Sequence, residues 1–306
     1  MTHGRLSAVT WFACCGLVIG VLVESASAQR PRRPDRERLP QPVYKVTERL
    51  ENPVVGDNDS NLGGGNLGPE QPEGAEHPLV PVLKMATDAY ADMQANIKDY
   101  SATLIKRERI GDKLMEQEFM FVKIRQQPFS AYTYFLGPPH KKGQEAIYVQ
   151  GKNENRIVGH GVGVQKLIGT VRLDPNGMIA MKDNKYPITE IGLFNLTEKL
   201  IEIGQKDMQF GECEVKTSPG AKINGRSCTC IQVTHPVPRK NFRFHVARVF
   251  YDDEMKLITR YEAYHWPAQR GGQPVLTEEY TYVDVKLNNG FTDADFDENN
   301  PTYGYR

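Results

Sequence analysis

The run of residues from Asp99 to Val149 constrains the fold of this chain more than any other segment. It is rich in Phe, Tyr, Val and Ile, which favour a pleated, half-buried surface. Turn residues interrupt it at Gly111-Asp112, at Pro128 and at Gly137-Pro138-Pro139. The pattern predicts four consecutive strands over 100–110, 114–126, 129–136 and 144–149. Because the connections are short, these strands should form a continuous antiparallel sheet.

The second half of the chain predicts more strands of the same kind and two helices. Turn signals separate five further strands, over 210–218, 226–235, 241–251, 256–265 and 275–287. Apolar residues recur at helical spacing over 81–98 and 189–203, and we expect Thr189 to cap the second helix and Gly204 to end it. The stretch between the predicted sheet halves, 151–181, is interpreted as an irregular loop. About nine strands and two helices that do not alternate predict an α+β fold with a mostly antiparallel sheet.

The first 28 residues have the layout of a secretory signal peptide. Arg5 precedes an apolar stretch over 8–23, and Ala26-Ser27-Ala28 supplies a cleavage site before Gln29. A retained membrane anchor is the alternative, but small residues follow the apolar stretch where a stop-transfer charge cluster would stand. We therefore expect an exported protein of the periplasm or cell envelope, with no transmembrane span once the signal is removed.

Composition divides the rest of the chain into a linker and one domain. Residues 29–77 are rich in Pro, Gly and Arg with few large apolar side chains, which predicts a disordered linker. Residues 78–306 are enough for a single β-rich domain. The chain has 38 basic and 38 acidic residues, and loss of the signal peptide removes one of each, Arg5 and Glu24. Nucleic-acid binding needs an excess of positive charge, so we expect no nucleic-acid partner.

Catalytic and cofactor motifs do not emerge from the sequence. It contains no Gly-x-Ser-x-Gly and no His-Glu-x-x-His. The glycines of 159–163 imitate a phosphate loop, but no Gly-Lys-Ser/Thr and no helix pattern accompany them. His235, His245 and His265 fall on successive predicted strands, where ordinary packing is favoured over a metal site. We expect no cofactor and no enzymatic activity, with a hydrolase built from scattered residues as the weaker alternative.

Three cysteines follow the predicted signal peptide: Cys213, Cys228 and Cys230. Cys228 and Cys230 share one face of a predicted strand, a spacing unsuited to a bond between them. Cys213 lies on the preceding predicted strand, so we expect a cross-strand disulfide from Cys213 to Cys228, with Cys230 as the alternative partner. Closing a loop of this length would stabilise the fold by about 3 kcal/mol in the chain-entropy model.

Several segments resemble known families. The strands SATLIKRERI and EQEFMFVKIRQQPFSAYTYF, followed by GQEAIYVQGKN, resemble the periplasmic lipoprotein-carrier, or LolA-like, fold. More closely, PFSAYTYFLGPPHKKGQEAIYVQGKN, NGRSCTCIQVTHP and YHWPAQRGGQPVLTEEYTYVDVKLNNGFTDADFD are similar to a family of exported bacterial proteins, the domain of unknown function 1571, over about residues 77–303. The first resemblance implies a strongly curved sheet, an open half-barrel, that wraps around two helices and leaves an apolar cavity for acyl chains.

The resemblance together with strand alternation predicts a lipid or a lipoprotein acyl chain as the ligand. A single-residue error in register would exchange the two faces of each strand. An envelope protein-interaction or stress-sensing module on the same scaffold is the alternative function, with a polypeptide as partner. The residues predicted to line the cavity are Tyr90, Met93, Met120, Val122, Ile124, Tyr132, Tyr134, Ile147, Val149, Leu193 and Leu200.

Overall fold

The computed structural model describes residues 76–211, 213–269 and 271–305. The predicted signal peptide over 1–28, and all but the last two residues of the predicted linker over 29–77, lie outside the described residues. Both therefore stay predictions.

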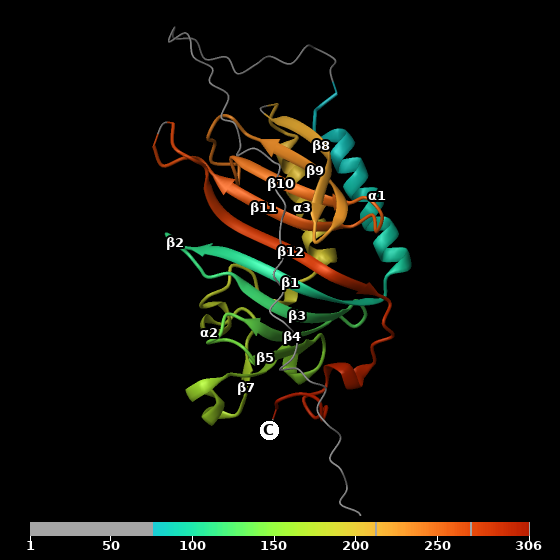
Figure 1. The fold of residues 1–306 in the computed structure, drawn as a ribbon, viewed down its shortest axis with the longest axis vertical. Helices are drawn as coiled ribbons and strands as arrows, with labels where there is room; N and C mark the ends of the chain where they lie inside the picture. The colour runs from blue at the N-terminus through green and yellow to red at the C-terminus, as the bar shows by residue number, and fades with distance from the viewer. Residues whose placement is uncertain (1–75, 212, 270, 306) are drawn as a thin grey trace, which may run out of the picture.

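One 12-stranded antiparallel sheet forms the body of the molecule (Figure 1). Its strands follow one another in the order β7-β6-β5-β4-β3-β1-β12-β11-β10-β9-β8, and the short β2 pairs with β1. The strands are β1 (Asp99–Ile110), β2 (Lys113–Leu114), β3 (Glu118–Arg125), β4 (Ser130–Gly137), β5 (Glu145–Val149), β6 (Ile157–His160), β7 (Thr170–Leu173), β8 (Glu214–Ile223), β9 (Arg226–Thr234), β10 (Val246–Asp252), β11 (Ile258–His265) and β12 (Val275–Leu287).

The sheet consists of two meanders joined where the first strand meets the last. Strands β1 and β3 to β7 form one half of the sheet, and strands β8 to β12 form the other. The two halves join where β12 pairs with β1. Tyr282 of β12 lies opposite Leu104 of β1, which lies opposite Met120 of β3. Directly opposed residues of antiparallel strands point to the same face, so these three side chains share one face at the centre of the sheet.

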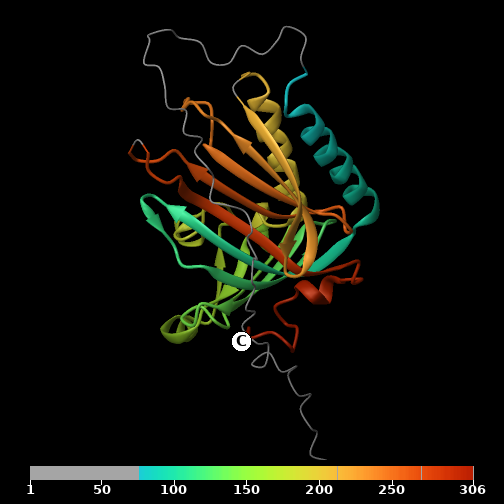
Figure 2. The same cartoon turned by 45° about the horizontal axis from the view of Figure 1, so that its top comes forward.

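The sheet is open and bent. Strands β7 and β8 form its two edges. Six strand-to-strand steps separate β12 from β7, which would be about 29 Å in a flat sheet. Nevertheless Tyr280 of β12 and Val171 of β7 line the same cavity, together with residues of the long helix over 193–207. The sheet must therefore curve around that helix, as Figure 2 shows.

Two helices, α1 (Val80–Asn96) and α3 (Leu193–Asp207), pack against each other on one face of the sheet (Figures 1 and 2). The predicted second helix was placed over 189–203, but α3 begins at Leu193 with Gly192 as its N-cap and continues to Asp207. Gly204 lies inside the helix, and a Cβ there would come 2.7 Å from Leu83 of α1. Gly204 thus allows the two helices to approach closely, and its prediction as a helix end was wrong.

Shorter helices occupy the connections. A one-turn helix α2 (Met178–Met181) follows β7. The 3₁₀ turns η2 (Asn153–Asn155), η3 (Gly163–Ile168) and η4 (Ile188–Glu190) lie between β5 and α3, and η5 (Asp293–Phe296) lies after β12.

The opposite face of the sheet is covered on one side by the C-terminal segment, residues 291–305. Tyr303 stacks on Tyr132 of β4, with ring centroids 4.2 Å apart. Tyr305 donates from its hydroxyl to the carbonyl oxygen of Val158 in β6 at 3.1 Å. With Phe296, these rings bury an apolar cluster that includes Ile147 and Val149 of β5.

The α+β class and the open antiparallel sheet are confirmed, while the predicted detail needs correction. The sheet has twelve strands where about nine were predicted. The missed strands are β2 and the pair β6 and β7, which lie in the stretch predicted as an irregular loop. Gly161, Gly163 and Gly169 lie between the two strands of this pair, and strands of only four residues lack a period long enough to recognise.

The predicted disulfide is also wrong. Cys213 and Cys228 are free thiols, and both are buried. Cys213 packs with Val249 on the helix-covered face, whereas Cys228 and Cys230 pack with Phe250 on the other face. The register of β8 on β9 places Ala221 opposite Cys228 and Ser218 opposite Cys230. Neither cysteine of β9 therefore lies opposite Cys213.

Candidate functional site

A cavity of about 1330 Å³ lies between the bent sheet and helix α3. Its walls come from strands β1, β3 to β7, β11 and β12, from α3, and from the connecting segment 161–192. Pockets that bind drug-sized molecules are usually of about 300–1,000 Å³. The cavity is therefore large enough for a ligand bigger than a typical metabolite.

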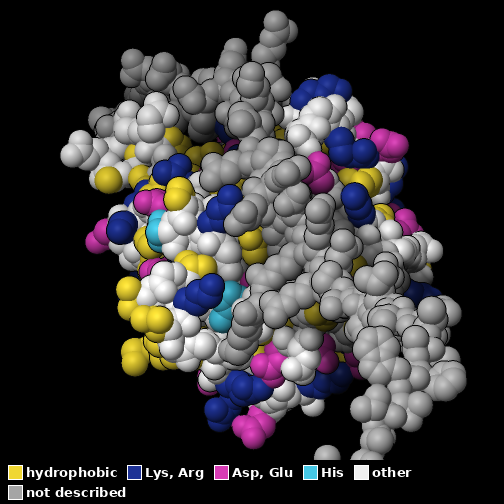
Figure 3. Space-filling view, turned by 60° about the horizontal axis from the view of Figure 1, so that its bottom comes forward, with side chains coloured by type: hydrophobic (Ala, Val, Ile, Leu, Met, Phe, Trp, Pro, Cys, Tyr) yellow, Lys and Arg dark blue, Asp and Glu magenta, His cyan; other side chains and the backbone are white. Residues whose placement is uncertain are grey.

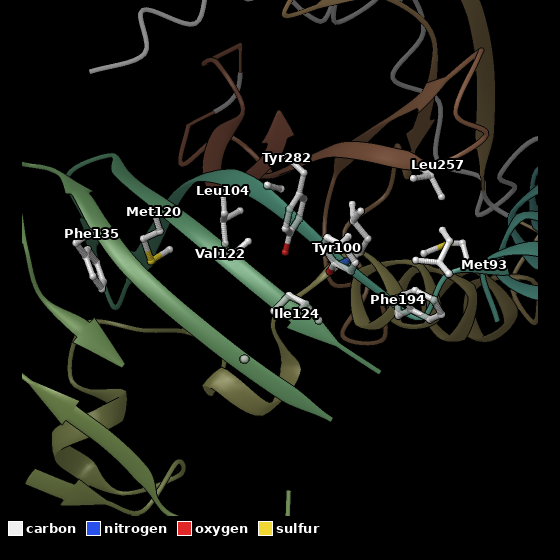
Figure 4. Packing of buried hydrophobic residues seen from close by; sticks show 14 residues of the cluster. Met93, Tyr100, Leu104, Met120, Val122, Ile124, Phe135, Phe194, Leu257 and Tyr282 are labelled. Atoms are coloured by element: carbon white, nitrogen blue, oxygen red, sulfur yellow. The ribbon is translucent and has the colours of Figure 1, made fainter. Parts of the chain in front are cut away.

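The sheet contributes an apolar wall to the cavity. Leu104, Met120 and Phe135 lie side by side on β1, β3 and β4 and all line it. In Figure 4 Leu104 and Met120 project from their strands beside Tyr282 of β12. Farther along, Ile157 of β6 and Val171 of β7 continue the wall toward the sheet edge.

Helix α3 forms the facing wall. Leu196, Leu200 and Ile203 lie on one side of the helix, three or four residues apart, and line the cavity. Ile188 and Ile191, from the turn that leads into the helix, extend this wall. The width of the apolar stripe on α3 follows from its position, because the helix faces both the packed core and the cavity.

One end of the cavity is ionic. Lys106 of β1 extends its ammonium to Glu108 at 3.2 Å and to Glu118 at 3.3 Å, and donates to the side-chain oxygen of Asn184 at 2.5 Å. Glu118 is also paired with Lys141. All three side chains on the sheet are buried, and buried charges require such pairing. The cluster ties the segment around Asn184 to the sheet.

The same segment is held by a second set of contacts. Glu108 accepts the backbone N–H of Lys185 at 2.9 Å, and the Lys185 ammonium pairs with Glu278 of β12 at 2.8 Å. The hydroxyl of Tyr280 donates to Glu108 at 2.6 Å. Burial, reinforced by Glu108 and Glu278, raises the pKa of Tyr280 well above its usual range. Tyr280 is therefore a hydrogen-bond donor here and does not become a phenolate.

The ring of His160 lies against the C-terminal segment, 5.0 Å from the ring of Tyr305, at a position that also borders the cavity. His160 Nδ1 is 3.0 Å from the carbonyl oxygen of Gly161, and Nε2 is 3.5 Å from a carboxylate oxygen of Glu145. The interaction with Glu145 raises the pKa of His160. Both ring nitrogens face acceptors, so the geometry favours the protonated ring and does not suit a general base. Glu145 also accepts the backbone N–H of Gly304 at 2.9 Å, which attaches the C-terminal segment at this point.

The structure places the eleven predicted lining residues in three groups. Met120 and Leu200 line the cavity. Tyr90, Met93, Val122, Ile124 and Leu193 lie on the same face of the sheet but belong to the solid core beside the cavity. Tyr132, Tyr134, Ile147 and Val149 lie on the other face, against the C-terminal segment.

The misplaced group results from an error in strand register. Val122 of β3 lies opposite Thr133 of β4, and Thr133 lies opposite Ala146 of β5. Odd-numbered residues of β4 therefore share a face with even-numbered residues of β3, contrary to the predicted set. The prediction assigned the even-numbered residues of both β3 and β4 to the cavity. Both faces of β4 are apolar, so alternation alone could not decide between them.

Sequence reasoning missed the ionic end of the cavity. Lys106 and Glu108 continue the inward-facing series of Leu104 on β1, so charged residues at two-residue spacing after a buried run carried the signal. Asn184, which contacts Lys106, and Lys141, which pairs with Glu118, come from connections whose position no local pattern fixes.

The described residues include neither a cluster of metal ligands nor a membrane-spanning helix. Across residues 76–211, 213–269 and 271–305, no three His, Cys, Asp or Glu side chains gather in a way that could hold a metal ion. Within these residues the structure also has no helix with the length and hydrophobicity needed to cross a bilayer.

Comparison with known proteins identifies one family. The family described as "Protein of unknown function (DUF1571)" matches residues 97–305, which confirms the resemblance in the segments quoted above. No curated protein matches the chain.

Several solved structures are similar at low identity. One is the lipoprotein LppX of Mycobacterium tuberculosis (13% identity, 70% of this chain and 98% of that chain, TM-score 0.40). Another is a DUF1329 family protein of Desulfovibrio piger (11% identity, 72% of this chain and 98% of that chain, TM-score 0.35). A third is a LolA superfamily protein of Nitrosomonas europaea (8% identity, 70% of this chain and 97% of that chain, TM-score 0.28). Because these sequence identities and TM-scores are low, the function of this chain has to be argued from its own residues.

Proposed function

The chain belongs to the family described as "Protein of unknown function (DUF1571)", and we propose that it is an exported, non-enzymatic binding protein that holds an apolar ligand, a lipid or the acyl chains of a lipoprotein, in the cavity beneath α3. The observation that carries this proposal is the cavity of about 1330 Å³ with apolar walls on both the sheet and the helix. Covering apolar ligand surface in such a space contributes about 25 cal/mol per Å² before the cost of association is subtracted.

The ionic end of the cavity suits an amphiphile better than a plain hydrocarbon. Lys106, Glu108 and Glu118 compensate one another, and Tyr280 and Asn184 add neutral hydrogen-bonding groups. A polar headgroup can exchange hydrogen bonds with these groups while the chains lie along Leu104 and Met120.

The absence of an enzymatic role is part of the proposal. The tyrosines that line the cavity have raised pKa values and stay protonated, and His160 is held between two acceptors. Such groups bind and orient a ligand more readily than they attack one.

The first test is direct analysis of the ligand. Native mass spectrometry of the protein purified from its own cell envelope should show a co-purified lipid or acyl-bearing molecule. A co-purified polypeptide in place of lipid would overturn the proposal in favour of the alternative interaction module. Cell fractionation with N-terminal sequencing tests export, and we expect a mature N-terminus at Gln29.

The second test fills the cavity. Ala146 of β5 lies between Thr133 and Gly159, and all three line the cavity. Ala146→Trp should occupy part of the volume and weaken binding of a fluorescent fatty acid by about tenfold, equivalent to about 1.4 kcal/mol. Gln150→Trp, an exposed position outside the cavity, is the matched control and should bind as the wild type does. Equal binding by the two variants, or no uptake by the wild type, would contradict the proposal.

A further inference from the structure

Exposed apolar side chains are concentrated in two short segments. Six large hydrophobic side chains are exposed in the described part of the chain, and five of them belong to η3 and α2. Single exposed apolar residues are common on protein surfaces, but a contiguous group of long, open side chains marks an interaction surface. The five are Val164, Leu167, Ile168, Met178 and Ile179, with exposed fractions of 82, 87, 71, 90 and 75%. We call them the rim.

The rim borders the cavity. Val164 and Ile168 of η3 and Met178 and Ile179 of α2 are highly exposed and at the same time line the cavity. They therefore stand at its mouth, where the cavity wall becomes surface. Figure 3 shows apolar side chains gathered at one edge of the molecule, on the side of the sheet where η3 and α2 lie in Figure 1. An apolar path thus leads from the cavity to the outside.

Basic residues outnumber acidic residues around the rim, by three to two over residues 161–183. Residues 161–173 carry Lys166 and Arg172 and no acidic residue, and residues 175–182 carry Lys182 and no acidic residue. Lys166 and Lys182 are exposed. Arg172 is paired with Glu298.

The two nearest carboxylates have contacts of their own. Asp174 accepts the backbone N–H of Asn176 at 2.8 Å. Asp183 lies 4.0 Å from the ammonium of Lys141. The rim therefore offers apolar side chains flanked by two exposed lysines and by the exposed Asp174, and a small basic excess beside apolar side chains suits the interface of an anionic bilayer.

We propose that the rim inserts into the surface of an anionic lipid bilayer and places the mouth of the cavity against the membrane. This inference deepens the proposed function, because an apolar ligand could then move between bilayer and cavity without crossing water. A bilayer fits the rim better than a protein partner does, because the side chains of the rim project from two separate short helical segments and continue into an apolar cavity. Binding should weaken with salt, since the lysine contribution is screened.

The experiment is flotation of the full chain with two kinds of vesicle, phosphatidylcholine alone and phosphatidylcholine mixed with phosphatidylglycerol. We expect binding to the mixed vesicles. The test variants are Leu167→Ser and the double variant Lys166→Glu with Leu167→Ser, because neither residue lines the cavity. The double variant should lose vesicle binding by about tenfold or more. Val237→Ser, at the remaining exposed apolar position, is the matched control and should bind as the wild type.

A second measurement separates this inference from the proposed function. Uptake of a fluorescent fatty acid from solution should be the same in the wild type and the Leu167 variants, because the cavity is intact. No binding to mixed vesicles, equal binding by all variants, or a dimer that Leu167→Ser dissociates would each overturn the membrane inference. Vesicle binding without fatty-acid uptake would support the rim and contradict the ligand proposal.

Discussion

At the scale of single residues, the pair of Asp207 and His235 shows how burial sets a protonation state. Both side chains are buried. His235 Nδ1 lies 3.3 Å from the carbonyl oxygen of Phe244, which can only accept, so Nδ1 carries the proton. Nε2 then faces Asp207 across 3.5 Å. Burial raises the pKa of Asp207 from 3.8 to about 6.

This arrangement predicts a pH-dependent effect of Asp207→Asn. The folded-state pKa of Asp207 lies above its unfolded value, so its contribution to stability is greatest below about pH 4 and is lost as pH rises through about 6. The amide of Asn carries no charge at any pH and removes this loss. Thermal unfolding should therefore show a stabilisation by Asp207→Asn that is larger at about pH 8 than at about pH 5, by about 1–2 kcal/mol, because part of the contribution of Asp207 is already lost at about pH 5.

Asp293 provides the control for this prediction. Contacts with Lys152 and Arg125 lower its pKa, so its contribution is present above the unfolded pKa and is lost only in acid. Asp293→Asn should therefore show no difference between about pH 5 and about pH 8. An Asp207→Asn variant whose stability follows the wild type at both pH values would contradict the assignment.

At the scale of elements, two tyrosines of the sheet fix the start of α3. The backbone N–H of Leu193 donates to the hydroxyl of Tyr100 of β1 at 2.6 Å, and that of Gly192 donates to the hydroxyl of Tyr282 of β12 at 3.0 Å. The first N–H groups of a helix have no partner within the helix, and no side chain of the cap residue supplies one here. The central strands of the sheet thus perform the capping and set where the cavity wall begins.

Removing either hydroxyl should loosen α3. Tyr100→Phe or Tyr282→Phe leaves a buried N–H without an acceptor, and we expect each to cost about 1–3 kcal/mol in the free energy of unfolding. Hydrogen exchange should speed up in the first turn of α3. Tyr305→Phe removes a hydroxyl bonded to Val158 on the other face, so it is the matched control and should leave exchange in α3 unchanged. Equal exchange in all three variants would refute the capping role.

At the scale of the whole molecule, the two faces of the sheet have different tasks. One face is partly hollow, beneath α3, and the other is filled by the C-terminal segment through Tyr303 and Tyr305. The aromatic residues of β4 and β5 that were predicted to line the cavity instead form this filled side. Stability and ligand binding should therefore be separable by mutation.

Tyr303→Ala tests this separation. The ring is buried and stacks on Tyr132, so its removal should reduce the free energy of unfolding by about 3 kcal/mol or more. Uptake of a fluorescent fatty acid by the folded variant should stay at the wild-type level, because the cavity lies on the other face. Tyr303→Phe keeps the stacked ring and should lose much less stability. A parallel loss of uptake and stability in Tyr303→Ala would show that the faces are coupled.

Local patterns predicted much of the element order and little of the site. The meander of β1, β3, β4 and β5 and the last strand β12 follow from alternation and turn residues, since these depend on neighbours in the chain. The predicted and observed bounds of β12 are the same. For the site, Met120 and Leu200 were placed beside the cavity, but the lysines and glutamates at its ionic end were not foreseen.

The sequence by itself determined an open antiparallel α+β sheet and the family to which the chain belongs, because period, turn chemistry and long matching segments are local properties. Only the tertiary structure decided which face of each strand is hollow, since β4 is apolar on both faces and its register against β3 selects between them. It also decided that the cysteines stay apart on two faces and that distant charges meet at one end of the cavity. Such contacts join residues far apart in sequence, and their pairing depends on how the sheet bends around α3.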